Sequence, residues 1–239
     1  MNQSRSRQLV IVLFGVIVAA IVGVIGIAIL ALPAEAAGLA EDVEDKLDQM
    51  GVKNPVTAVL LNFRGYDTLL EITVLLLAVL GARALATAGS RDEAEQIASP
   101  INPVLLGFIR IIAPVVIVVA GYLLWVGGHA PGGAFQAGAV LAALGVLLKL
   151  AEVNWTQHVS ECSERLLLTG ALAVFIAVGV GTMTGERHFL EYSSSAAKWC
   201  ILAIEAVATL SIAAILLALF CGGTFRDAGQ SHDSEQRSS

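Results

Sequence analysis

Residues 121–150 read GYLLWVGGHAPGGAFQAGAVLAALGVLLKL, and this stretch decides the fold that the sequence predicts. It belongs to a longer run, from Ile111 to Leu148, that contains no Asp, Glu, Lys or Arg. That run exceeds the roughly 20 apolar residues that one membrane helix needs. Pro131 and its neighbouring glycines interrupt the run, because proline ends a helix and glycine permits tight turns. We therefore expect two membrane helices joined by an elbow, residues 127–133.

Small residues recur at helical spacing after the elbow, at Ala134, Gly138, Ala142 and Gly145. Such a stripe lets membrane helices approach each other closely, so we expect this face to pack against protein. Lys149 extends the stripe by one turn. It either contributes to an ion path on the packing face or reaches with its ammonium group to the membrane interface.

The composition indicates a membrane protein with several spans. The 239 residues are 56% hydrophobic and only 14% charged, with a mean hydropathy of +0.79. The net charge of −6 comes largely from acidic patches outside the apolar runs, so nothing favours nucleic acid as a partner. The three cysteines show no CxxC or CxxH spacing. We expect apolar packing roles for them, with no metal site, disulfide framework or cofactor.

Working outward from the elbow, the sequence predicts an all-α, polytopic membrane protein with about six transmembrane helices. The first two are separated by an acidic segment, residues 35–54, whose apolar spacing predicts a short surface helix. Most Lys and Arg residues fall on the side of the two termini, which predicts that both termini are cytoplasmic. The expected spans are 9–34, 67–87, 104–126, 133–150, 166–184 and 198–220.

A polar connector, residues 83–103, predicts a boundary between two modules, because it carries Pro100 and Pro103. The first module, residues 1–97, would hold two helices, and the second, residues 98–225, would hold four. The polar, serine-rich tail, residues 226–239, is expected to be disordered.

Carboxylates inside the predicted spans are the main functional candidates. Glu205 is the only charged residue between Lys198 and Arg226. A charge at such a depth costs about 2.5 kcal/mol or more on insertion scales, so it is usually retained for a reason. Glu205 is either part of a proton or cation relay, or a hydrogen-bonding clamp between two helices.

Asp67 and Glu71 lie four residues apart, hence on one helical face. They either anchor a helix end in an ion-pair cluster with Arg64 or form part of an ion or proton path. Asp67 is also a candidate for the cap of the second membrane helix. His129, in the elbow, is a further path candidate; the alternative is an interfacial hydrogen bond.

Residues 128–138, GHAPGGAFQAG, resemble the elbow of the B subunit of Mrp-type multisubunit Na⁺/H⁺ antiporters, the MnhB-type domain. The resemblance covers about residues 100–222, the four spans that are usual in that family. Ala134 and Ala137 stand where the family pattern has glycine, and the spacing between His129 and Pro131 is one residue shorter. The resemblance marks a structural motif that comprises Pro131, Gly132, Gly133, Phe135 and Gly138.

Residues 62–74, NFRGYDTLLEITV, resemble the C-terminal end of the large A subunit of the same antiporters. A small subunit of membrane-bound hydrogenases carries a similar segment. Here Asn62 replaces the usual acid and Leu70 the usual glycine. The resemblance adds Arg64, Gly65 and Thr68 to the structural motif and places Glu71 at the position of an intramembrane acid.

The resemblance implies a non-redox accessory subunit, without a cofactor, that lines or supports an ion path in a cation/proton antiporter-type complex. The implied partners are larger antiporter-like membrane subunits, other small subunits, the lipid bilayer, H⁺ and, as a candidate, Na⁺. The implied location is the cell inner (plasma) membrane, as a multi-pass protein, and the chain itself would not be an enzyme. One alternative is the same module in a complex I-like respiratory, hydrogenase or carbon-uptake complex. Another is a purely structural scaffold, in which every charge clamps helices.

Overall fold

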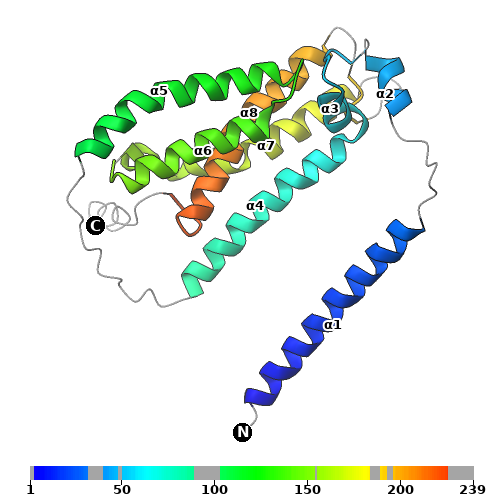
Figure 1. Cartoon of the computed structure of the whole chain (residues 1–239), viewed down its shortest axis with the longest axis vertical. Coiled ribbons are helices and arrows are strands. Elements are labelled where there is room, and N and C mark those ends of the chain that lie inside the picture. The colour runs from blue at the N-terminus through cyan, green and yellow to red at the C-terminus, as the bar shows by residue number, and fades with distance from the viewer. Residues whose placement is uncertain are drawn as a thin grey trace, which may run out of the picture. The chain divides into compact units, whose positions relative to one another are not determined.

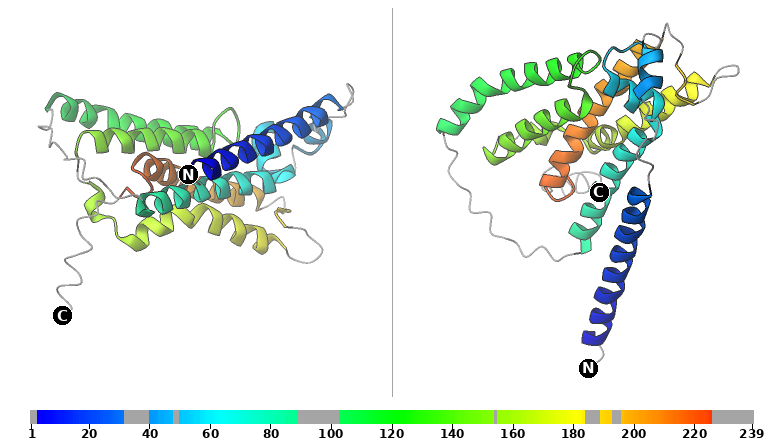
Figure 2. Two further views of the ribbon diagram at one scale, coloured as in Figure 1. Left: turned by 90° about the horizontal axis from the view of Figure 1, so that it is seen from below. Right: turned by 45° about the vertical axis from the view of Figure 1, so that its right-hand side comes forward.

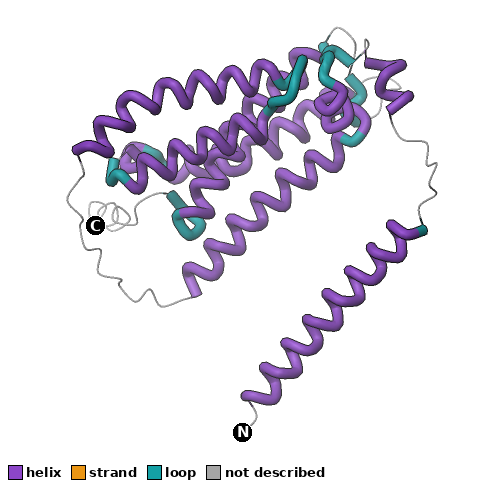
Figure 3. The backbone as a smooth tube through the Cα atoms, in the orientation of Figure 1, coloured by secondary structure: helices purple, strands orange, loops and turns teal. Residues whose placement is uncertain are grey.

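The structure is a computed structural model, and it describes residues 3–31, 40–47, 50–88, 103–153, 155–183, 189–192 and 196–225. Within these ranges the chain consists of helices and turns, without a β-strand (Figure 3). The prediction of an all-α protein is therefore confirmed. The predicted disordered tail and most of the predicted connector lie outside the described residues.

The chain divides into two compact units, residues 1–41 and 42–239, which are described separately. The first unit is built on α1 (Gln3–Leu30), which begins six residues before the predicted span because its first turns extend into polar sequence. Its apolar part, Val12–Leu30, is long enough to cross a membrane.

The second unit carries the remaining long helices (Figure 1). Four of them, α4, α5, α7 and α8, are long and apolar enough to span a membrane. The fifth, α6, has 17 residues and lies at the short end of the range of about 17–25 residues that span a bilayer. The elements after α1 are α2 (Ala40–Lys46), α3 (Pro55–Ala58), the π-helix η2 (Val59–Phe63), α4 (Gly65–Ala88), α5 (Pro103–Val126), α6 (Ala134–Leu150), the 3₁₀-helix η3 (Trp155–His158), α7 (Glu161–Thr182) and α8 (Ala197–Phe220).

In the second unit, two helices begin two or more residues earlier than the sequence predicted. The helix α7 starts at Glu161, five residues before the predicted span, because the side chain of Ser160 accepts a hydrogen bond from the backbone of Ser163 and caps it. The helix α4 starts at Gly65, so Asp67 lies inside the first turn instead of at the cap position. Acidic residues in a first turn are favourable because they face the positive end of the helix dipole.

The helix α8 lies at the centre of the second unit and packs against α4, α6 and α7, while α5 packs mainly on α6 (Figure 2). The predicted small-residue stripe of α6 faces α8. A Cβ atom at Gly138 would lie 2.9 Å from Ile212, and one at Gly145 would lie 3.1 Å from Leu217. The expectation that this face packs against protein is confirmed.

Three connections meet at one end of the second unit: the turn before α3, the elbow between α5 and α6, and residues 189–192 before α8. The backbone of Lys53 donates to the carbonyl of Gly128 at 2.7 Å, and Leu190 packs on Gly65. These are connections that the sequence predicts on one side of the membrane, and the structure places them at one end. That this side is external stays a prediction.

Candidate functional site

The site begins with the short segment that leads into α4. Asn54 caps α3, since its Oδ1 accepts a hydrogen bond from the backbone of Val56 at 3.1 Å, and Pro55 fills the first helical position. The chain then widens into the π-helix η2, a feature that is frequent at functional sites. The hydroxyl of Thr68 donates to the carbonyl of Leu60 at 2.7 Å, which ties η2 to α4.

This segment holds the elbow in place. The Nδ2 of Asn54 donates to the carbonyls of Gly127 and Ala130, both at 2.9 Å, and the hydroxyl of Thr57 donates to Gly127 at 2.6 Å. Asn54 and Thr57 are both buried. Neither residue was predicted from the sequence, where the one signal for Asn54 is its position before a proline, which is typical of a helix cap.

Two positions of the elbow require glycine, because other backbone atoms lie very close to them. The backbone N–H of Gly133 donates to the carbonyl of Leu123 at 2.8 Å, which folds the elbow back onto the end of α5. A Cβ atom at Gly127 would lie 2.6 Å from the Cα of Gly133, and one at Gly132 would lie 2.5 Å from the oxygen of Leu123. Neither position has room for a side chain.

Glu205, on α8, reaches the point where the elbow turns into α6. Its side chain is buried, with 7% of the residue exposed, and it accepts a hydrogen bond from the backbone of Ala134, the first residue of α6. A carboxylate at a helix N-terminus is stabilised by the unpaired N–H groups and the helix dipole. Gly133 has a φ of 112°, and a Cβ atom there would lie 3.0 Å from Oε1 of Glu205.

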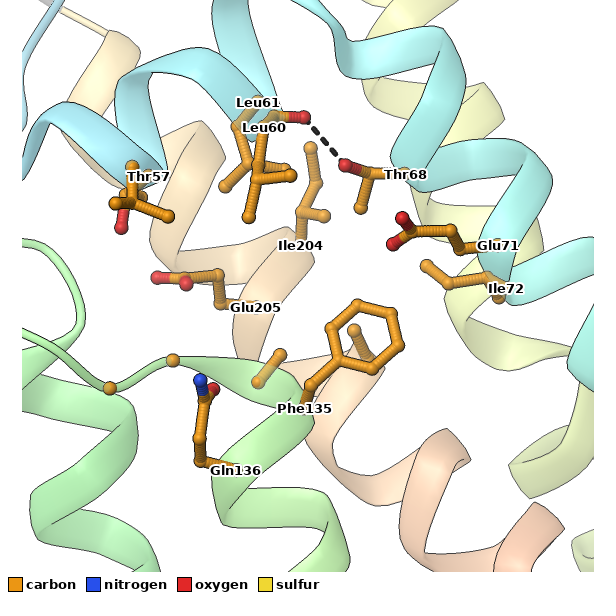
Figure 4. Close-up of a pocket in the computed structure, with 15 residues that line it drawn as sticks. Thr57, Leu60, Leu61, Thr68, Glu71, Ile72, Phe135, Gln136, Ile204 and Glu205 are labelled. Carbon is orange, nitrogen blue, oxygen red and sulfur yellow. Dashed lines mark hydrogen bonds between the residues drawn. The ribbon is translucent and has the colours of Figure 1, made fainter. Parts of the chain in front are cut away.

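A cavity of about 270 Å³ lies between η2, α4, α6 and α8 (Figure 4). Glu71 borders it from α4 and Glu205 from α8, and Thr57, Thr68 and Gln136 add polar groups to a largely apolar wall. Several residues of the two predicted motifs meet here, namely Thr68, Gly132, Gly133 and Phe135. Two of the three carboxylates that the sequence singled out, Glu71 and Glu205, therefore share one cavity.

The other predicted path residues lie elsewhere. Asp67 forms an ion pair with Arg64, and both side chains are substantially exposed. Lys149 lies in the last turn of α6, at the opposite end of that helix from the cavity.

His129 borders a second, smaller pocket of about 30 Å³, together with Lys198 and Glu205. Glu205 thus contributes to the walls of both cavities. Nearby, in the connection before α8, the buried hydroxyl of Tyr192 has no hydrogen-bond partner among the described residues. Burial, with a smaller contribution from Cys200, raises the pKa of Tyr192 above its usual range.

A buried polar cluster at the far end of the second unit was also missed. Arg83 on α4 pairs with Glu164 on α7 at 2.8 Å, and Thr224 donates to the same carboxylate at 2.9 Å. The Nε of Arg83 donates to the carbonyl of Gly223 at 2.6 Å. Arg83 was expected at the edge of the polar connector and Glu164 between two predicted spans, whereas both lie within helices.

The fold and the cavity together define a multi-pass, all-α protein of the cell membrane with carboxylates inside its helical unit. Residues 104–226, just over half of the chain, match the family described as "Domain related to MnhB subunit of Na+/H+ antiporter". The chain belongs to this family, as the sequence motif predicted. No curated protein matches the sequence at a significant level.

Two solved structures show a similar fold. One is the Mrp complex from Dietzia sp. DQ12-45-1b, with a TM-score of 0.63 and 23% identity, over 95% of this chain and 27% of the matched chain. The chain thus spans about a quarter of the length of that relative. The other is the membrane-bound sulfane sulfur reductase, an archaeal respiratory membrane complex, with a TM-score of 0.53 and 20% identity, over 88% of this chain and 97% of the matched chain.

Proposed function

We propose that the chain is a non-redox accessory subunit of a multisubunit cation/proton antiporter-type complex, and that its larger cavity forms part of an ion or proton path. The observation that carries this proposal is the convergence of Glu71 and Glu205 on one cavity. Family membership and the two similar complexes support the assignment to a complex.

The chemistry of the cavity suits proton or cation transfer. A volume of about 270 Å³ has room for several water molecules. Two carboxylates from different helices, with hydroxyl and amide groups between them, can exchange protons through such water or bind a cation through oxygen atoms. Carboxylates within a membrane span are costly, so they are retained mainly for function or for specific pairing.

The position of Glu71 supports the need for partner subunits. The side chain of Glu71 is exposed. The residue lies about 9 Å along α4 from Gly65, at a rise of about 1.5 Å per residue. Within the described residues its carboxylate has no hydrogen-bond or ion-pair partner. An acid facing hydrocarbon at that depth would be unfavourable, so we infer that a neighbouring subunit of the complex covers this flank.

Two alternatives make different predictions. Membership in a respiratory membrane complex is supported by the match to nearly the full length of a chain in the sulfane sulfur reductase. This alternative keeps the same ion path and changes only the driving module, which the proteins that co-purify in mild detergent would reveal. In the scaffold alternative, Glu71 and Glu205 only hold helices together.

Substitution of Glu71 tests the ion path directly. Glu71→Gln keeps the shape and hydrogen bonding of the side chain but removes its titratable proton. We expect the variant complex to assemble at normal abundance while its transport rate falls by about 100-fold, the lower end of what a positioned acid–base group contributes. Glu71→Asp should retain part of the rate. Transport is measured as Na⁺-dependent dissipation of a pH gradient in membrane vesicles, with complex abundance measured in parallel.

Glu161→Gln is the matched control, because Glu161 is exposed on α7 and its ion pair among the described residues is with Arg165 along the same helix. It should leave transport and assembly unchanged, since exposed ion pairs contribute little. The scaffold alternative predicts the opposite pattern: Glu71→Gln is tolerated and Glu71→Ala loses assembly. Full transport by the Glu71→Gln complex would end the ion-path proposal.

A further inference from the structure

Glu205 separates two cavities of different size and character. The larger one, of about 270 Å³, contains Glu71 on its far wall, and the smaller one, of about 30 Å³, lies beside the elbow. His129 and Lys198 border the smaller pocket and are exposed, whereas Glu205 is buried. The smaller pocket is therefore bordered both by exposed side chains at the elbow end and by the buried Glu205.

The lining of the smaller pocket favours protons over metal cations. Among the described residues, His129, Lys198 and Glu205 are the ionisable side chains in its walls. A volume of about 30 Å³ admits one or two water molecules but not a hydrated Na⁺ ion. A proton, in contrast, can pass along water by exchange of hydrogen bonds and needs no such space.

We propose that the smaller pocket is a proton access channel, and that Glu205 passes protons between this pocket and the cavity that holds Glu71. Water in the pocket takes up a proton from the surface and passes one on to the Glu205 carboxylate, so that the relaying water stays neutral. The resulting carboxylic acid then releases the proton to water in the larger cavity, from which Glu71 takes it up. His129 assists at the mouth, because an imidazole both accepts and donates protons under physiological conditions.

The surroundings of Glu205 fit a carboxylate that exchanges protons with both cavities. One contact comes from the backbone of Ala134, and Gly133 presents no side chain to the carboxylate. No other carboxylate or basic group pairs with Glu205 among the described residues. A clamp by an ion pair would have such a partner, whereas the hydrogen bond from Ala134 joins α6 to α8 without one.

This proposal rests on the proposed function, and the test separates the two. Gly128 lines the smaller pocket, and a Cβ atom there would meet only Val52, at 3.8 Å, so Gly128→Val should fill the pocket without a clash. Gly121→Val is the matched control, because a Cβ atom at Gly121 meets nothing within 4 Å and this residue lines neither cavity. Both are made in the assembled complex, and Na⁺-dependent proton flux in vesicles is measured with sodium chloride in H₂O and in D₂O.

In Gly128→Val we expect the maximal rate to fall at least about tenfold while the KM for Na⁺ stays unchanged. The solvent isotope effect should rise, because proton access becomes rate-limiting. Gly121→Val should behave like the unmodified complex. If Gly128→Val lowers complex abundance, Leu202→Phe narrows the same pocket from α8 and is judged by the same readouts.

An assembled, pocket-filled variant with a normal rate and an unchanged isotope effect would overturn the access channel. If Glu71→Gln abolishes transport in the same vesicles, the ion path through the larger cavity still stands. If Glu71→Gln transports normally, the proposed function itself fails.

Discussion

The carboxylate of Glu205 fills the space that a side chain at Gly133 would need. A Cβ atom at Gly133 would lie 3.0 Å from Oε1 of Glu205, and the φ of 112° at Gly133 is one that residues with a side chain rarely adopt. The last glycine of the elbow and the buried acid of α8 therefore depend on each other. This relationship gives a physical reason for the glycine that immediately precedes α6.

Gly133→Ala should displace the Glu205 carboxylate. We expect a loss of about 1–3 kcal/mol in stability from the strained backbone, seen as a lower melting temperature of the purified complex. Transport per assembled complex should fall further than abundance does. Gly121→Ala, at a position with open space around it, is the control. Normal transport by assembled Gly133→Ala would contradict the dependence.

Asn54 should be needed both as a cap and as a donor to the elbow. Asn54→Ala removes both roles and should cost about 1–2 kcal/mol for the cap alone. Asn54→Asp keeps the oxygen that accepts from Val56 but turns a second oxygen toward the carbonyls of Gly127 and Ala130. We therefore expect Asn54→Asp to be less stable than Asn54→Ala in thermal melting of the complex.

Substitutions of Thr57 test its own hydrogen bond to the elbow, which it donates to the carbonyl of Gly127. Thr57→Ser keeps the hydroxyl that donates to Gly127 and should retain stability, whereas Thr57→Val should lose it. Equal melting temperatures for Thr57→Val and Thr57→Ser would show that this hydrogen bond does not hold the elbow.

Removing one partner of the Arg83–Glu164 pair should be strongly destabilising. Glu164 is almost fully buried, so Arg83→Met leaves an uncompensated charge, a loss of about 3–5 kcal/mol in comparable cases. Arg83→Met combined with Glu164→Gln should recover part of this loss. A double-mutant cycle on detergent-solubilised complex measures the coupling. Additive effects of the two substitutions would refute a direct interaction.

The sidedness of the chain is open to a labelling experiment. We expect single cysteines introduced after residues 50, 130 and 190 to react with an impermeant thiol reagent from outside the cell. The structure places these connections at one end of the second unit, so the three positions should behave alike. Labelling of residue 130 from the cytoplasmic side would reverse the topology.

Much of the fold was predictable, because charge-free runs and a stripe of small residues report directly on membrane helices and their packing. The stripe from Ala134 to Gly145 predicted a face that packs closely against protein, and the structure shows that α8 is the partner. The first residues of the helices were less predictable. The cap at Ser160 lets α7 begin at Glu161, in a polar stretch that precedes the predicted span. Caps of this kind depend on one local hydrogen bond and leave little trace in hydropathy.

For the candidate site, the sequence indicated Glu71 and Glu205 separately but not that they share a cavity. Their meeting depends on how α4 packs against α8, which no local pattern encodes. The contacts of Asn54 and Arg83 were missed for the same reason, since each side chain binds a partner far away in sequence.

The ion pair between Arg83 and Glu164 also joins the two predicted modules, and so does the larger cavity, which takes Glu71 from the first and Glu205 from the second. Were these modules separate chains, they would have to find each other by diffusion in the membrane. A covalent connection replaces that search with an effective concentration that is in the millimolar range for short flexible linkers. It also fixes their ratio at one to one, so that both walls of the cavity are always supplied in equal numbers.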